Sequence, residues 1–272
     1  MSCISRATSR ARLWARILAR LRGEGPRLNL ALGASAIVDT LRFSLSRQRA
    51  LSPKSLFSGV VRLRRGDLCW WVRAGTDDIY NVLPHREGEV DEAIRGVLQP
   101  GDVFVDVGAN VGYYSIVASS LVGHEGAVVA VEPMPSTCRV LKMNCDLNHS
   151  TNVRLVPNAV SESEGMAPLY FCGYHGMASL EASKGTIIEV PTTTLDAICA
   201  SYTHIKLVKI DAEGAEYRIL SGASATMKKT DHIVVECGSD RDRILDLLGR
   251  SGFACSHCSF ATYVWATAGV DE

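Results

Sequence analysis

The sequence lacks any run of about 20 apolar residues, any internal repeat and any low-complexity segment. The missing run predicts that no helix crosses a membrane. Arginines interrupt every apolar stretch near the N-terminus, which excludes a secretory signal. Hydrophobic residues make up 47% of the 272 residues and charged residues 21%, as in ordinary globular proteins. The chain is therefore long enough for one large domain with an extension.

The chain also has no net charge, but its positive and negative residues are unevenly distributed along the sequence. Residues 1–65 hold 14 Lys and Arg against only Glu24 and Asp39, a net charge of +12, and the remainder carries −12. The acidic body argues against nucleic acid as a partner. The basic leader is expected to contact something anionic, such as a membrane surface or the body itself.

A disulfide framework is also missing. The nine cysteines are odd in number and scattered, and several lie in apolar runs, which is typical of reduced, buried thiols. Cys255 and Cys258 have the spacing of half a zinc site, but no second pair has metal-ligand spacing. An ordinary strand is the better interpretation, so no metal site is predicted.

The leader, residues 1–55, is expected to contain a helix that the segment 23–26 ends. Its apolar residues recur at helical spacing, with arginines along another face. These sets are Leu13, Trp14, Ile17, Leu18 and Leu21, and Arg12, Arg16 and Arg20. A basic amphipathic helix can lie on an anionic bilayer, which predicts a cytoplasmic protein with peripheral contact at the inner membrane face. A transit peptide and a poorly ordered or core-docked extension stay open as alternatives.

The rest of the chain divides into a small β/α element, residues 56–100, and a main domain, residues 101–272. Apolar strand patterns alternate with helical ones in the main domain, which predicts a parallel sheet. Strands are expected at 103–107, 127–131, 153–156, 205–210 and 233–235, with an antiparallel edge pair at 253–258 and 262–266. A less regular insert, about residues 166–190, is expected to contain two strands.

The most informative motif follows the first main strand and reads Asp106-x-Gly108-x-Asn110-x-Gly112. A dinucleotide loop reads G-x-G-x-x-G, so that bare backbone can receive a pyrophosphate. Here a carboxylate at the strand tip would repel phosphate. It suits S-adenosylmethionine (AdoMet), which carries an ammonium and a sulfonium but no phosphate. The motif therefore indicates methyl transfer.

A second acid, Glu132, ends the next strand about 20 residues later and is placed to accept hydrogen bonds from both ribose hydroxyls. Nicotinamide sites share this feature. A nicotinamide-dependent oxidoreductase is therefore one alternative, although the third glycine of its loop is missing. A non-catalytic AdoMet-binding scaffold is another.

Further motifs lie at regular intervals around this loop. Residues 73–79, 106–112, 132–133, 158–160, 194–196 and 205–216 read R-A-G-T-D-D-I, D-V-G-A-N-V-G, E-P, N-A-V, T-L-D and I-K-L-V-K-I-D-A-E-G-A-E. Together they resemble the FkbM-type methyltransferases, and the likeness covers about residues 56–267. The family methylates hydroxyls on natural products and glycans. The resemblance therefore implies O-methylation of a glycan, a lipid-linked sugar or a natural-product small molecule.

The resemblance implies a class I methyltransferase (Rossmann-like) fold, with seven mostly parallel strands and helices on both faces of the sheet. It implies AdoMet as cofactor, with Asp106, Gly108, Asn110 and Gly112 around its methionyl part. It also places Glu132 at the ribose and Asn158 near the adenine. From the sequence alone, Asn158 is equally well an ordinary turn residue.

Asp211, at the tip of the fourth main strand, is the best candidate to act on the acceptor, because open α/β sheets bind ligands there. The alternative is that it caps the following helix. Glu213 and Glu216 either orient substrate or favour the helix dipole. His175, in the insert, is a second candidate base. With Glu236, these acids are also chemically suited to Mg²⁺, although no spacing requires it.

Overall fold

The structure is a computed structural model that describes residues 3–46, 52–171, 178–180, 186–257 and 263–269. It divides the chain into two units, the first ending at Arg86 and the second beginning at Glu87. Each unit is described by itself.

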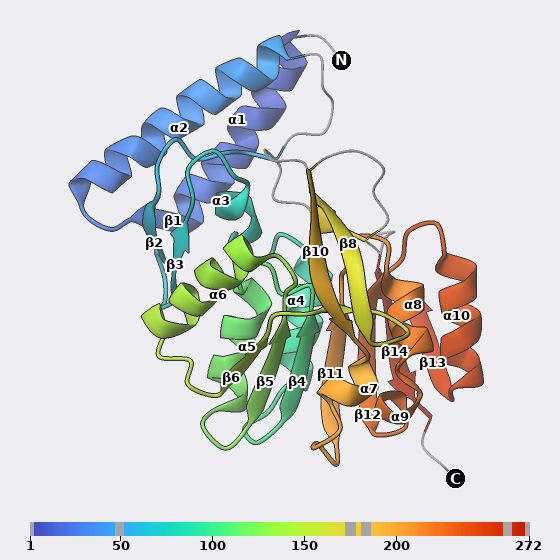
Figure 1. Cartoon of the computed structure of the whole chain (residues 1–272). Helices are drawn as coiled ribbons and strands as arrows, with labels where there is room; N and C mark the ends of the chain where they lie inside the picture. Colours follow the sequence, from blue (N-terminus) through green and yellow to red (C-terminus); the bar gives the residue numbers. More distant parts are fainter. Residues whose placement is uncertain (1–2, 47–51, 172–177, 181–185, 258–262, 270–272) are drawn as a thin grey trace. The chain divides into compact units, whose positions relative to one another are not determined.

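The first unit pairs two long helices with a small antiparallel sheet of order β1-β2-β3 (Figure 1). Its elements are α1 (Cys3–Arg20), β1 (Leu21–Gly23), α2 (Pro26–Leu45), β2 (Gly59–Leu63), β3 (Cys69–Val72) and α3 (Asp78–Asn81). The predicted break at 23–26 is confirmed: Asn29 bonds to the backbone of Gly23 and Gly25, and Pro26 opens α2.

The leader is ordered as a helical hairpin. The apolar face predicted for α1 is present, but Trp14, Ile17 and Leu21 are buried inside the first unit. Asp39 on α2 fixes the pair, because it accepts a hydrogen bond from Trp14 Nε1 at 2.8 Å and forms an ion pair with Arg10 at 3.1 Å. The amphipathicity of α1 thus serves packing within the unit.

The expectation that no segment is long and apolar enough to cross a membrane is wrong. By length and composition, the 20-residue helix α2 qualifies, with a mean hydropathy of 1.2 over its best window, of which only 17% is buried. Its apolar residues are separated by small and polar ones, so no continuous run is visible in the sequence although the average is high.

In the second unit, a seven-stranded sheet of order β13-β14-β12-β11-β4-β5-β6 confirms the predicted fold class. The five strands from β12 to β6 are parallel, and β14 and β13 close the edge as the expected antiparallel pair. The sheet strands are β4 (Val103–Val107), β5 (Ala127–Val131), β6 (Val153–Val156), β11 (Ile205–Ile210), β12 (Thr230–Glu236), β13 (Phe253–His257) and β14 (Tyr263–Ala268).

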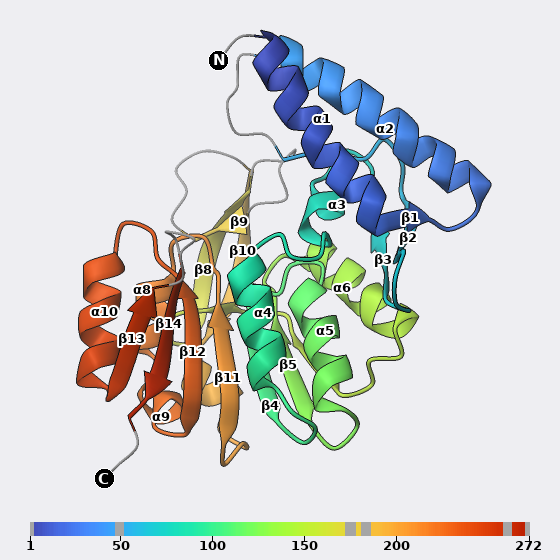
Figure 2. The same ribbon diagram turned by 180° about the vertical axis from the view of Figure 1, so that it is seen from behind.

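Helices cover both faces of this sheet. Figure 1 shows α7 and α9 in front of it, and Figure 2 shows α4 and α5 in front of its other face. The helices are α4 (Gly88–Val97), α5 (Tyr113–Val122), α6 (Pro135–Leu147), α7 (Leu195–Ile198), α8 (Glu216–Ser221), α9 (Ser224–Met227) and α10 (Arg241–Arg250). Double coverage explains why the central strands read as nearly continuous apolar runs.

The insert forms a second sheet of order β7-β10-β8-β9. It consists of β7 (Ala159–Val160), β8 (Gly165–Phe171), β9 (Ala178–Ser179) and β10 (Thr186–Thr193). The antiparallel pair β8 and β10 supplies the two expected strands, and β7 adds to β10 in parallel. Leu169 and Val190 share a small core with Met134 and Ala159.

The position of the site follows from the strand order. The chain leaves β4 toward β5 on one side and β11 lies on the other side of β4, so the connections diverge between these strands. Such a switch point leaves a crevice at the carboxyl ends of the strands, where ligands bind. Asp106 and Asp211 both lie at this end of their strands.

Candidate active site

The loop after β4 depends on glycine for its shape. Gly108 has φ of +78° and lies so close to β11 that an added Cβ would be 1.8 Å from the carbonyl oxygen of Asp211. Gly112, with φ of +91°, begins α5 where a Cβ would be 2.3 Å from a methyl carbon of Leu141. At both positions glycine is therefore required for two reasons: the backbone has positive φ, and there is no space for a Cβ.

Glu132 joins the exits of two neighbouring strands. Its carboxylate accepts the backbone N–H of Asn110 at 3.0 Å and that of Met134 at 2.9 Å. The residue is buried, but a carboxylate offers about four acceptor positions. A carboxylate at this position fits the ribose contact implied by the resemblance, because ribose hydroxyls are hydrogen-bond donors.

Asp106 is buried at the centre of the sheet. One carboxylate oxygen accepts a hydrogen bond from Ser115 Oγ at 2.6 Å. The other, Oδ1, is buried and has no hydrogen-bond partner among the described residues. Burial raises the pKa of Asp106, and Lys209 counteracts this shift. An orphaned acceptor in the crevice fits a cationic donor such as the ammonium of AdoMet.

Lys209 is the buried cation of the site. Its Nζ lies 3.2 Å from Asp211 Oδ2 and 3.8 Å from Asp106 Oδ1, and 5.2 Å from the centre of the Tyr114 ring. Burial opposes its charge, but Asp211, Asp106 and Glu87 outweigh burial and raise the pKa of Lys209. Lys209 therefore stays protonated and holds the two carboxylates together.

Asp211 forms a carboxyl pair with Glu236. Asp211 Oδ2 also accepts the hydroxyl of Tyr263 at 2.9 Å, and its side chain is 17% exposed. Burial, the charge of Asp211 and a hydrogen bond to Asp211 raise the pKa of Glu236 to about 8. At neutral pH the pair therefore holds one proton, and Asp211 is the partner that contacts Lys209 and Tyr263.

The segment after Asp211 corrects two expectations. Helix α8 begins at Glu216, with Ala215 at its N-cap, so Asp211 is not a capping residue. Glu216 is buried and accepts the backbone N–H groups of Ala212 and Gly214. Glu213 lies outside the helix, exposed, with φ of +52°. Of the two glutamates, Glu216 has the structural role of shaping the loop.

Among the described residues, Asn158 is not joined to this cluster. Asn158 is half-buried in the turn between β6 and β7, after the third main strand as expected. His175 lies outside the described residues. Within the described ranges, no group of three His, Cys, Asp or Glu side chains is arranged to hold a metal ion.

The sequence analysis did not identify Lys209 or Tyr263 as site residues. It named Glu236 only as a possible ligand of Mg²⁺. A signal for Lys209 was available: it is the charged residue of the otherwise apolar segment 207–210, and a lysine in a buried strand needs anionic partners. Tyr263 carries no comparable signal. Its position in the site depends on the antiparallel pairing of β14 with β12, which the local sequence does not reveal.

Comparison with known proteins adds a family and two relatives. The family model for the methyltransferase FkbM domain matches residues 106–255. Protein-L-isoaspartate O-methyltransferase of Caenorhabditis elegans is 25% identical over 139 residues, which are 48% of this chain and 59% of that protein. The similar segment thus spans about six tenths of that relative. Hexuronic acid methyltransferase AglP of Haloferax volcanii is 28% identical over 186 residues, 64% of this chain and 73% of that protein.

Among solved structures, a SAM-dependent O-methyltransferase of Thermotoga maritima aligns over 78% of each chain, with 13% identity and a TM-score of 0.45. The range matched by the family model contains Asp106, Glu132, Lys209, Asp211 and Glu236. Tyr263 lies beyond that range.

Proposed function

Because the chain belongs to the FkbM methyltransferase family and is an AdoMet-dependent methyltransferase, we propose that it methylates a hydroxyl oxygen. The acceptor is a glycan, a lipid-linked sugar or a natural-product small molecule. The family membership sets aside the nicotinamide-dependent alternative. AglP, a relative, acts on a hexuronic acid, which makes uronic acids the first acceptors to test.

The carboxyl pair Asp211–Glu236 carries this proposal. A hydroxyl is a poor nucleophile until its proton begins to leave, so transfer to oxygen needs a base near the methyl group. Asp211 is partly exposed at the carboxyl end of β11, and its neighbour Glu236 has a pKa raised to about 8. A carboxyl pair that loses its proton near this pH can then take up the proton of an acceptor hydroxyl.

When bound, AdoMet supplies a methyl group on a sulfonium, which is a good leaving group. Asp106, Asn110 and Glu132 would hold it. Asp106 offers a buried carboxylate oxygen without a described hydrogen-bond partner, Asn110 the conformation of the loop, and Glu132 a carboxylate at the exit of β5. Asp211 would accept the proton of the acceptor hydroxyl, which would make the hydroxyl oxygen nucleophilic toward the methyl group that AdoMet supplies. Lys209 and Tyr263 orient the Asp211 carboxylate during this step.

The cofactor part of the proposal is tested by calorimetry of AdoMet binding. Wild type is expected to bind, Asp106→Ala and Glu132→Ala to bind at least about tenfold more weakly, and Glu125→Ala to bind as wild type does. Glu125 is the matched control, since its side chain is 78% exposed. Absence of binding by the wild type would contradict the cofactor assignment.

The acceptor part is tested with methyl-labelled AdoMet and a panel of uronic acids, neutral sugars and lipid-linked sugars. A labelled product that survives mild alkali is a methyl ether and supports transfer to a hydroxyl. A product that mild alkali hydrolyses is an ester. Ester formation on a carboxyl group, with no ether from any acceptor, would overturn the hydroxyl assignment while leaving the methyltransferase class intact.

A further inference from the structure

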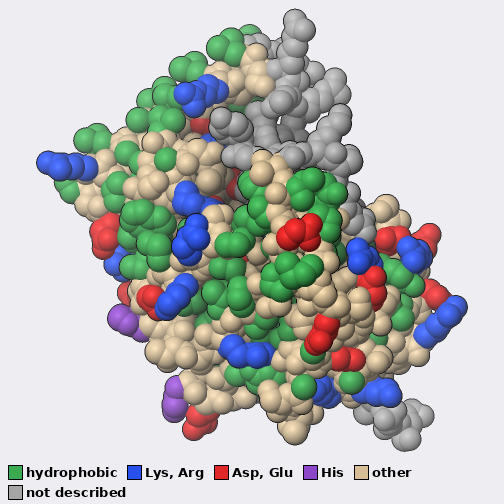
Figure 3. Space-filling model, viewed as in Figure 1, with side chains coloured by type: hydrophobic (Ala, Val, Ile, Leu, Met, Phe, Trp, Pro, Cys, Tyr) green, Lys and Arg blue, Asp and Glu red, His purple; other side chains and the backbone are tan. Residues whose placement is uncertain are grey.

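Helix α2 has an exposed apolar surface, and no described residue of the first unit covers it. We call Leu30, Ala34, Ile37, Leu41 and Leu45 the α2 stripe. They recur at intervals of three and four residues, so they lie along one side of the helix. The four large side chains are 76%, 65%, 58% and 80% exposed. Figure 3 shows hydrophobic side chains gathered along this helix.

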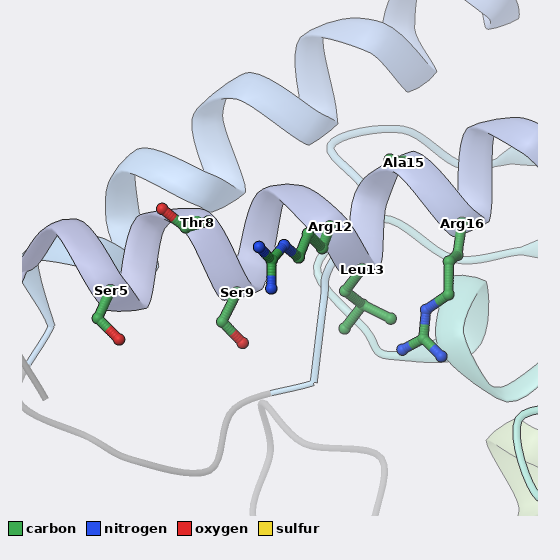
Figure 4. Close-up of a pocket in the computed structure, with 7 residues that line it drawn as sticks. All are labelled: Ser5, Thr8, Ser9, Arg12, Leu13, Ala15 and Arg16. Carbon is green, nitrogen blue, oxygen red and sulfur yellow. The ribbon is translucent and has the colours of Figure 1, made fainter.

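The exposed surface of α1 has a different character. Five of the seven residues that line a shallow hollow along α1 are serine, threonine or arginine, the others being Leu13 and Ala15. Figure 4 shows Ser5, Ser9, Leu13 and Arg16 on the side turned away from α2. The large apolar residues Trp14 and Ile17 are buried. The helix that the sequence suggested for membrane contact therefore has no comparable exposed apolar stripe, and α2 has one.

We propose that the α2 stripe docks on the surface of an anionic lipid bilayer, with α2 lying in the plane of the interface. Charge complementarity favours this occupant. Arg27 and Arg42 are exposed near the two ends of the stripe, about 22 Å apart along the helix. Residues 1–86 hold 16 Lys and Arg against five Asp and Glu, so the unit attracts anionic headgroups and repels a second copy of itself.

The hairpin argues for lying on the membrane rather than crossing it. Asp39 projects from α2 toward α1, where it is bonded to Arg10 and Trp14. If α2 crossed the bilayer, this carboxylate would be carried into the hydrocarbon or separated from its partners, and either is costly. An interfacial helix keeps Asp39 on the protein side and places the stripe in the acyl boundary.

The test is cosedimentation of the full chain with vesicles of phosphatidylcholine alone and of phosphatidylcholine with phosphatidylglycerol. Binding is expected to the anionic vesicles, to weaken with salt, and to be removable by alkaline carbonate. Ile37→Glu and Leu41→Glu should each lower the partition constant at least about tenfold, because each places a charge where an apolar side chain would enter the acyl boundary. Arg27→Ser with Arg42→Ser should lower it on anionic vesicles only.

Met143→Glu is the matched control, because Met143 is also an exposed large apolar residue (41%) but lies on α6 of the second unit. It should bind vesicles as wild type does. AdoMet affinity unchanged in Ile37→Glu would show that the variant is folded. Three results would overturn the proposal: equal binding by Ile37→Glu, carbonate-resistant insertion, or vesicle-independent dimerisation that Ile37→Glu abolishes. None of these outcomes depends on the methyl acceptor.

Discussion

Lys209 and Asp106 are register partners on adjacent parallel strands, and they bring opposite charges together inside the sheet, with Nζ 3.8 Å from Oδ1. Both side chains are almost fully buried, at 2% and 1% exposure. Asp211, two residues beyond Lys209, adds a second carboxylate at 3.2 Å. The centre of the site is therefore one buried cation that serves two anions.

Replacing Lys209 by methionine should strongly destabilise the protein. The change leaves two carboxylates near each other in a buried environment, and removing one partner of a buried ion pair costs about 3–5 kcal/mol. The matched control is Lys206→Met, since Lys206 pairs with Asp231 on the surface and such pairs contribute about 0–1 kcal/mol. Urea unfolding measures both, and equal losses would contradict a charged role for Lys209.

The rate of methyl transfer should rise with pH through a value near 8, where the Asp211–Glu236 pair loses its proton. Glu236→Gln should remove this inflection from the profile of kcat/KM. Stability should respond in the opposite sense. Because the pKa of folded Glu236 is raised from 4.5, the folded state holds the proton longer, and wild type should lose stability from about pH 4.5 to 8. A flat rate profile, or an inflection kept in Glu236→Gln, would contradict the assignment.

Tyr263→Phe should move the same inflection upward by about one pH unit. The hydroxyl of Tyr263 donates to Asp211 Oδ2, and a hydrogen bond to a charged group contributes about 1.5–3 kcal/mol. Its loss makes the ionised pair less favourable, so the rate at neutral pH should fall. Tyr217→Phe is the control. The Tyr217 ring packs against the guanidinium of Arg243, with its centre 3.7 Å from the guanidinium carbon, and Tyr217 is not part of the carboxyl pair. A lower rate with an unshifted profile would indicate a structural role alone.

Gly108→Ala should weaken AdoMet binding and cost more than about 2 kcal/mol beyond Gly101→Ala. Both glycines have positive φ, +78° and +90°, so both substitutions share the backbone strain. Only at position 108 would the new Cβ meet backbone, the Asp211 carbonyl, whereas nothing lies within 4 Å at position 101. Comparing the two variants by unfolding and calorimetry isolates the close approach of the loop to β11.

The fold was largely predictable because each central strand is buried on both faces and reads as a short apolar run between turn residues. β6 and β11 have the predicted bounds, Val153–Val156 and Ile205–Ile210. Local pattern also located Asp106 and Asp211, which end such runs. It could not show that Lys209 lies within ion-pair distance of both, because that depends on the register between two strands far apart in sequence.

The leader was harder to interpret for the opposite reason. Amphipathic spacing identifies a helix but not what its apolar side faces. In α1 that side faces the interior of the first unit, so Trp14 and Ile17 are unavailable to a membrane. In α2 the spacing is obscured by small residues, and its exposure is visible only once the hairpin is formed.

The insert sheet begins and ends at the same place. Strand β7, which leads into it, and β10, which leads out, are hydrogen-bonded neighbours, with Ala159 opposite Thr192. The pairing of β7 with β10 thus holds the two ends of the intervening segment together, whatever the length of that segment. Such a segment can lengthen, shorten or be exchanged between related enzymes without shifting the strands that carry Asp106 and Asp211. The boundary between β7 and β10 is therefore where chimaeric enzymes should be joined.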